Sequence, residues 1–176
     1  MEHTLTSHAR GLTLRFAQPQ DVTTILGFIR ELADYEHLAH EVVADESSLT
    51  ETLFGERRYA EVVLAEQDDD PAGFALFFHN YSTFLARPGI YLEDLYVRPT
   101  HRGCGIGEAL LTTLARIACD RGCGRLEWSV LDWNEPAIGF YERLGARPQD
   151  DWTVYRVTGE ALDALAARFP ASEDPA

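Results

Sequence analysis

The segment from Arg102 to Gly107 reads R-G-C-G-I-G and carries residue types that can hold a phosphate group. Apolar residues follow it at the spacing of one helical face, so the glycines stand where a strand gives way to a helix. The first turn of a helix offers unpaired backbone N–H groups and the positive end of the helix dipole to an anion. Glycine lets a ligand approach the main chain, and Arg102 adds a positive charge. The segment is therefore predicted to be an anion-binding turn.

Two common phosphate-binding loops do not fit this spacing. A P-loop needs a Gly-Lys pair, and the chain contains no lysine. The dinucleotide fingerprint is G-x-G-x-x-G, whereas Gly103, Gly105 and Gly107 give G-x-G-x-G. The turn taken alone also fits a helix entry that binds no ligand.

Four further motifs accompany the turn in a fixed order. They read F-I-R-E-L-A-D-Y-E at 28–36, Y-L-E-D-L-Y-V at 91–97, V-L-D-W-N at 130–134 and F-Y-E-R-L-G-A at 140–146. Together they resemble the GCN5-related N-acetyltransferase (GNAT) superfamily, in the branch of the spermidine/spermine and thialysine N-acetyltransferases, from about residue 12 to residue 168. The resemblance implies an α/β fold with helices flanking a central, strongly bent mixed β-sheet. It also implies acetyl-CoA as co-substrate and a homodimer.

The resemblance implies two groups of residues that hold the cofactor. The backbone edge along Leu95, Tyr96 and Val97 takes the pantetheine arm like an added strand, and the turn takes the pyrophosphate. A second group comes from the later motifs, where Asn134 bonds the pantetheine amides and also suits the cap of the next helix. The complete set is Leu95, Tyr96, Val97, Arg102, Gly103, Cys104, Gly105, Ile106, Gly107, Asn134, Ala137 and Tyr141.

The chemistry of amine acetylation assigns roles to several of these residues. An alkylamine has a pKa of about 10.4, so removing its proton at neutral pH costs roughly 4 kcal/mol, and a carboxylate can help. The family places Glu93 in the cleft as that base, although a strand carboxylate in a salt bridge is the alternative. Asp94 follows it in the strand and should face the opposite side unless a bulge intervenes. The amide of Leu95 is implied as the donor that stabilises the oxyanion.

Tyr141 is implied as the acid that protonates the departing coenzyme A thiolate. A phenol pKa of about 10 is close to that of a thiol, which suits proton transfer between them. Without the motif, a tyrosine on an amphipathic helix would be read as part of the core.

Residues for the acceptor amine are Tyr35, Glu36, Thr83, Glu93, Asp94 and Asp150. Tyr35 and Glu36 match substrate-contacting positions of the family but could simply end a surface helix. Thr83 stands where polyamine-acetylating members carry aspartate, so the chain looks more like the thialysine branch. Asp150 is suggested as a second contact to an ammonium group. Lysine-like amino acids, thialysine, diamines and polyamines are the candidate acceptors.

The composition narrows the possible partners, locations and functions of the protein. The chain has 176 residues and a net charge of −14, which disfavours binding to nucleic acid, although an acidic surface also serves solubility alone. The sequence shows no membrane-spanning run and no signal-peptide pattern, so a cytoplasmic location is expected. The three cysteines show no disulfide framework or metal site. A protein or antibiotic acetyltransferase, or a non-catalytic coenzyme A sensor, remains open.

The pattern predicts one domain over residues 11–170, with disordered ends at 1–10 and 171–176. Strands are expected at 12–17, 59–66, 73–80, 91–97, 126–131 and 153–157, with a hairpin turn at 68–71. Helices are expected from Asp21, after Asp45, from residue 105 or 106 to about residue 121, at 135–144 and at 159–169.

Overall fold

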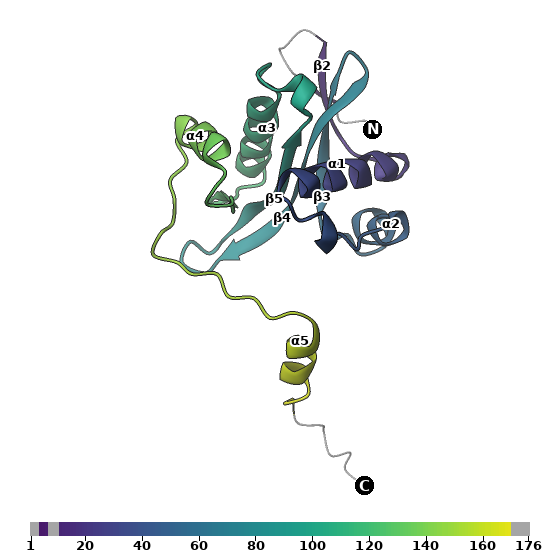
Figure 1. The fold of residues 1–176 in the computed structure, drawn as a ribbon. Coiled ribbons are helices and arrows are strands. Elements are labelled where there is room, and N and C mark those ends of the chain that lie inside the picture. Colours follow the sequence, from purple (N-terminus) through teal and green to yellow (C-terminus); the bar gives the residue numbers. More distant parts are fainter. Residues whose placement is uncertain (1–3, 7–10, 170–176) are drawn as a thin grey trace. The chain divides into compact units, whose positions relative to one another are not determined.

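The computed structural model describes residues 4–6 and 11–169 (Figure 1). Most of the two ends predicted to be disordered lies outside these ranges, and Thr4–Thr6 forms a short strand. The chain divides into two compact units, one ending at Ser129 and one starting at Val130. The single domain over 11–170 stays a prediction.

The first unit is built on a mixed β-sheet. In the described part of the chain its strand order is β1-β2-β3-β4-β5-β6 (Figure 1). The strands are β1 (Thr4–Thr6), β2 (Leu12–Phe16), β3 (Glu61–Gln67), β4 (Asp70–Ser82), β5 (Arg87–Val97) and β6 (Leu126–Trp128). Neighbouring strands pair antiparallel as far as β5, whereas β5 and β6 pair parallel. The predicted α/β class with a mixed sheet is confirmed.

The predicted hairpin between β3 and β4 turns at Asp68 and Asp69. Both residues have positive φ angles, 51° and 69°, as the two central residues of a type I′ turn do. The twist of this turn matches that of the two strands it joins. Aspartate tolerates this conformation better than most other residues do. The hairpin is therefore where the sequence placed it, but β4 already begins at Asp70.

Helices cover both faces of this sheet. Phe28 of α1 (Val22–Tyr35) stacks on Phe74 of β4, with ring centroids 5.4 Å apart. Arg121, which follows α3 (Ile106–Asp120), lies over the ring of Phe77, 5.8 Å from its centroid. Residues 74 and 77 of a regular strand point to opposite faces, so α1 and α3 lie on opposite sides of the sheet.

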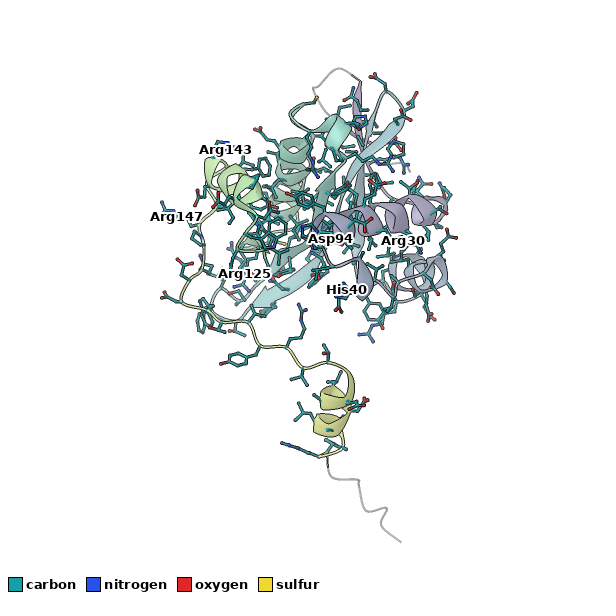
Figure 2. All side chains as sticks on the ribbon, in the orientation of Figure 1. Arg30, His40, Asp94, Arg125, Arg143 and Arg147 are labelled. Carbon is teal, nitrogen blue, oxygen red and sulfur yellow. The ribbon has the colours of Figure 1, made fainter. Side chains whose placement is uncertain are left out.

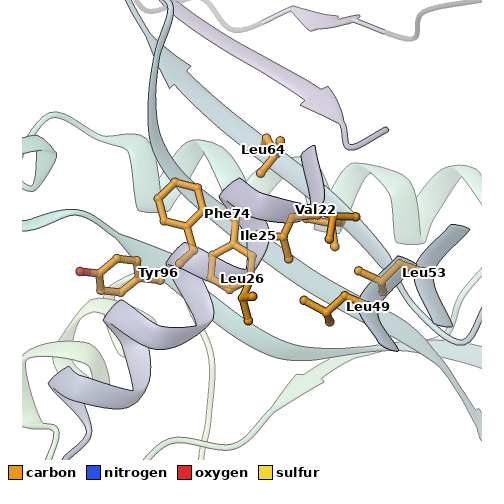
Figure 3. Packing of buried hydrophobic residues seen from close by; sticks show 10 residues of the cluster. Val22, Ile25, Leu26, Leu49, Leu53, Leu64, Phe74 and Tyr96 are labelled. Carbon is orange, nitrogen blue, oxygen red and sulfur yellow. The ribbon is translucent and has the colours of Figure 1, made fainter. Parts of the chain in front are cut away.

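The core on the α1 side is shared with α2 (Glu46–Phe54), whose N-terminus Asp45 caps as predicted by accepting from the Ser48 N–H at 2.8 Å. Figure 3 shows the packed side chains of α1, α2 and the sheet. Arg98, just after β5, donates to Glu31 of α1 at 2.8 Å and to the Pro71 carbonyl at 2.8 Å. This pair holds the later turns of α1 against the end of β5.

Three single 3₁₀ turns connect these elements of the first unit: η1 (Pro19–Asp21), η2 (Ala39–Glu41) and η3 (Pro99–His101). Within the described ranges, no helix combines the length and apolar character needed to cross a membrane.

The second unit contains α4 (Glu135–Arg143) and α5 (Gly159–Ala166). Asn134 caps α4 by accepting from the Ala137 N–H at 3.4 Å, and Pro136 lies in the first turn, as expected. The prediction of a strand at 153–157 was wrong, because these residues form no strand. Its alternating pattern is that of a strand, but a strand also needs a neighbouring edge to bond with. The strand predicted at 126–131 ends earlier, at Trp128.

Candidate functional site

The glycine-rich turn lies between η3 and α3. Gly103 and Gly105 have φ angles of 80° and 83°, and Gly105 is the residue that caps α3. A Cβ atom added at either glycine would meet no heavy atom within 4 Å, so backbone conformation and not crowding demands glycine there. Because glycine has no side chain to cap the helix, the first N–H groups of α3 stay available to a ligand. Gly107 lies inside the first turn of α3 and is helical.

Arg102 lies against the end of β5. Its Nε donates to the Val97 carbonyl at 2.9 Å, and its guanidinium lies 4.8 Å from the Tyr35 ring centroid and 5.7 Å from that of Tyr96. The side chain therefore joins a residue predicted for the substrate, Tyr35, to the strand predicted for the cofactor. The sequence motif alone could not reveal this stacking.

A β-bulge interrupts β5 at Glu93. Leu92 pairs with Phe77 and Asp94 pairs with Leu76, so Glu93 is an extra residue in the ladder. Cross-strand partners project to the same face, which puts Asp94 on the α1 side with Leu76 and Leu92 on the α3 side with Phe77. The bulge therefore breaks the alternation of faces at Glu93, which is exposed and whose charge acts on Asp94.

The same bulge redirects the backbone of β5. The Ile90 N–H donates to the Arg125 carbonyl beside β6 at 3.0 Å, whereas the Arg98 N–H donates to the Ala72 carbonyl of β4 at 2.9 Å. In a regular strand, two residues an even number of positions apart point their N–H groups to the same edge. Ile90 and Arg98 point theirs to opposite edges, because the extra residue between them reverses the order. The N–H of Leu95 and the carbonyl of Val97 therefore point away from β4.

This edge of β5 is not covered by β6 along its whole length. The parallel pairs run from Ile90–Leu126 to Leu92–Trp128, one residue before the bulge. Beyond these pairs, the residues predicted to bind pantetheine have backbone groups on an edge of β5 that β6 does not cover. An extended ligand with amide groups could bond there as an added strand does.

Two neighbouring carboxylates act on Asp94. Burial first, and then the negative charges of Glu93 and Glu36, raise the pKa of Asp94 to about 6 (Figure 2 labels Asp94). Burial also raises the pKa of Glu36, the residue at which α1 ends. Among the described residues, the ion pairs include none of these three carboxylates. Such a cluster attracts a cation and contains a carboxyl group that exchanges its proton near neutral pH.

The structure does not bring Thr83 near this cluster. Thr83 lies in the turn between β4 and β5, where Ser82 pairs with Arg87. Glu93 lies six positions after Arg87 in β5, which corresponds to about 20 Å along the strand. Within one chain, Thr83 is therefore remote from the predicted base.

The second unit carries the remaining predicted residues, three of them on α4 or at its N-cap and Asp150 beyond it. Asn134, Ala137 and Tyr141 are spaced by three and four residues, which places them on the same face of α4. Asn134 is buried, and the ring of Tyr141 lies 5.2 Å from that of Phe140. Asp150 is exposed in the segment after α4.

Other features of the surface do not coincide with these residues. A hollow of about 350 Å³ lies between the end of β2, the end of α2 and the start of β3, and none of the predicted site residues lines it. In residues 4–6 and 11–169, no group of three or more His, Cys, Asp or Glu side chains is placed to hold a metal ion. Cys104 is exposed in the turn.

Comparisons with known proteins point in one direction. Residues 25–146 match the family model described as "Acetyltransferase (GNAT) family". An L-ornithine N5-acetyltransferase of Arabidopsis thaliana is 36% identical, with 91% of this chain and 90% of the relative covered. A thialysine N-epsilon-acetyltransferase of Sus scrofa is 39% identical, with 88% and 97% covered. An integron cassette protein from the V. cholerae mobile metagenome has a similar structure, with a TM-score of 0.76, 28% identity, and 90% and 99% covered.

Proposed function

The chain belongs to the GNAT acetyltransferase family, and we propose that it transfers the acetyl group of acetyl-CoA to a primary amine of a small cationic acceptor. It is an N-acetyltransferase, and members of this family use acetyl-CoA. The observation that carries the proposal is the bulge at Glu93, beside the half-buried Asp94, which turns backbone groups of β5 to an uncovered edge.

The residues of the chain suit both parts of the cofactor. The N–H groups at the start of α3 would bond the pyrophosphate, and the edge at Leu95 and Val97 would bond the pantetheine amides. Arg102 now donates to the Val97 carbonyl, so a ligand that needs this acceptor would share it or displace Arg102. The proposal also assigns cofactor binding to Asn134 and Ala137, at the start of α4.

Acetyl-CoA supplies an electrophilic thioester, and residues of the chain accept and donate the protons that the reaction moves. A carboxylate near Glu93 would take the proton that an ammonium group must lose before its nitrogen can attack. The Leu95 N–H would stabilise the oxygen that becomes negative on attack. Tyr141 would give a proton to the sulfur as the carbon–sulfur bond breaks. The amine nitrogen of the acceptor gains the acetyl group and becomes an amide, and coenzyme A leaves as a thiol.

Glu93 remains the proposed base, with Asp94 as its rival. A carboxyl group with a pKa of about 6 is mostly ionised at pH 7 yet holds a proton more tightly than an ordinary aspartate. The three carboxylates, Glu36 included, would favour a cation over a neutral or acidic acceptor. Tyr35, beside Arg102, would contact the same ligand.

The relatives that act on ornithine and thialysine support an amino-acid acceptor with a terminal amine. Such a molecule carries its own carboxylate beside its α-ammonium and needs fewer acidic side chains there than a polyamine does. Diamines and polyamines remain candidates, with Thr83 and Asp150 as the proposed contacts for a distant group. We also place the protein in the cytoplasm as a homodimer that binds neither nucleic acid nor membrane.

An acceptor screen tests this function. Release of coenzyme A thiol from acetyl-CoA is measured with L-ornithine, thialysine, putrescine, spermidine and spermine. The expected order places the two amino acids first in kcat/KM. Binding of acetyl-CoA without thiol release on any amine would instead indicate a coenzyme A sensor, and preference for spermine would overturn the assignment of the acceptor class.

A further inference from the structure

Polar side chains gather at a second place on the α1 face of the sheet. In β4, Leu76 and Asn80 are four positions apart, so both lie on the face that carries Asp94. The Asn80 side chain donates to Oε2 of Glu127 in β6 at 2.7 Å. The same carboxylate oxygen lies 2.7 Å from Nε of Arg125 (Figure 2 labels Arg125). Asn80, Arg125 and Glu127 therefore form one polar cluster within the first unit.

The hydrogen bonds of this polar cluster are incomplete. Within the described residues, two buried side-chain atoms have no hydrogen-bond partner, and both belong to the cluster: Oδ1 of Asn80 and Nε of Arg125. The Arg125 Nε is close to the Glu127 carboxylate but is not aligned for a hydrogen bond. Buried polar groups usually have partners, because leaving one without a partner is costly. The guanidinium can therefore accept a further anionic ligand.

Backbone contacts and packing fix the place of Arg125. The Ile90 N–H of β5 donates to the Arg125 carbonyl at 3.0 Å. A Cβ atom added at Gly89 would lie 2.9 Å from Cγ of Arg125, so the arginine side chain crosses β5 where that strand has no side chain. The guanidinium and the Glu127 carboxylate therefore lie side by side on the face of the sheet.

Two aromatic rings lie between the polar cluster and Asp94. Phe78 of β4 is two positions from Asn80, and its ring centroid is 5.3 Å from that of Tyr91 in β5. A hydrogen bond of 2.8 Å joins the Tyr91 hydroxyl to Oγ of Ser129. Aromatic rings offer an apolar surface to a chain of methylene groups. The face thus runs from acidic residues, over aromatic rings, to an arginine paired with a glutamate.

The spacing along this face suits a basic α-amino acid. The four positions from Leu76, the partner of Asp94, to Asn80 correspond to about 13 Å. Five bonds of about 1.5 Å, from a terminal amine nitrogen to a carboxylate carbon, span roughly 6 Å when extended. Side chains at the two ends cover the remaining distance. The head group of an α-amino acid carries an ammonium and a carboxylate, and Glu127 and Arg125 offer the opposite charge to each.

We propose that Arg125 binds the α-carboxylate of an amino-acid acceptor whose terminal amine lies at the carboxylates near Glu93. The proposal rests on the acetyl transfer proposed above and names the group that selects amino acids over diamines. A guanidinium matches a carboxylate with two parallel hydrogen bonds, whereas it repels the second ammonium group of a diamine. Glu127 contacts the α-ammonium group, and Asn80 positions Glu127.

L-Ornithine and putrescine are matched probes, because they differ by one α-carboxylate. Calorimetric titration of each onto the protein with saturating coenzyme A measures binding without turnover. Arg125→Gln should weaken ornithine binding by roughly 10- to 100-fold, as for a lost hydrogen bond between charged groups, and should not weaken putrescine binding. Arg125→Lys keeps the charge and should lose less. Arg116→Gln, which breaks an exposed ion pair of α3, is the matched control and should change neither affinity.

Thiol release from acetyl-CoA, measured in parallel, separates this inference from the proposed function. The KM for ornithine should rise in Arg125→Gln while kcat changes little, because the residue lies away from the reacting amine. Equal losses of ornithine and putrescine binding would give Arg125 a structural role only, and unchanged ornithine binding would remove it from the site; either result overturns the inference. Wild-type turnover on neither acceptor would contradict the proposed function, and the titrations would still decide the role of Arg125.

Discussion

Asp94→Asn should stabilise the folded protein at alkaline pH and have much less effect in acid. The carboxyl group has its pKa raised from 3.8 to about 6, by burial first and then by Glu93 and Glu36. The folded state therefore binds a proton that the unfolded state releases between these two values. The free energy of unfolding must fall as the pH rises through this window, and the loss is complete above it.

The magnitude follows from the shift. About two pKa units at 1.36 kcal/mol each give about 3 kcal/mol, which is the largest gain expected from Asp94→Asn at pH 8. At pH 4 most of the penalty is absent from the wild type, so the two proteins should differ little. Activity should fall although stability rises, because the amide removes one of the negative charges proposed to attract the cationic acceptor.

Urea unfolding at pH 4, 6 and 8 measures these differences. Asp34→Asn is the matched control, since it makes the same chemical change at an exposed position of α1 and should alter stability little at any pH. An equal gain from Asp94→Asn at pH 4 and pH 8, or an equal gain from Asp34→Asn, would refute the argument.

Three further predictions concern the reaction. Gly105→Val forces a branched residue into a φ angle of 83° and should weaken acetyl-CoA binding in calorimetry, whereas Gly27→Ala in α1 should not; wild-type affinity would exclude this turn as the site. Tyr141→Phe should lower kcat by ~10²-fold with little change in acetyl-CoA affinity, and near-normal turnover would transfer the role to another donor. Glu93→Gln should lose most activity at neutral pH and recover partly at alkaline pH, where solution supplies free amine; a defect independent of pH would argue against a base.

Sequence alone was sufficient wherever the signal is local. Helix caps at Asp45 and Asn134, the turn at Asp68 and Asp69, and the glycine entry to α3 depend on neighbours within a few residues, so their chemistry can be read along the chain. The ordered motifs also identified the acetyltransferase family, which the comparisons confirm.

Tertiary structure alone decided the arrangement of the acidic residues. The adjacent letters E-D predict opposite faces, but the register between β4 and β5 leaves Glu93 as an extra residue of the strand and breaks that alternation. A bulge depends on how a partner strand aligns, which a single segment does not encode. The raised pKa of Asp94 follows from that alignment, since Glu36 lies 58 positions away in the sequence.

The segment at 152–157 also shows that a sequence pattern does not decide by itself whether a strand forms. Its side chains alternate as a strand requires, yet the chain leaves them exposed and unpaired in a sheet. Alternation determines which side chains would share a face, because that period is fixed by the backbone of each residue. Whether a strand forms is decided by an edge that satisfies its N–H and carbonyl groups, and only the folded molecule shows whether that edge is in place.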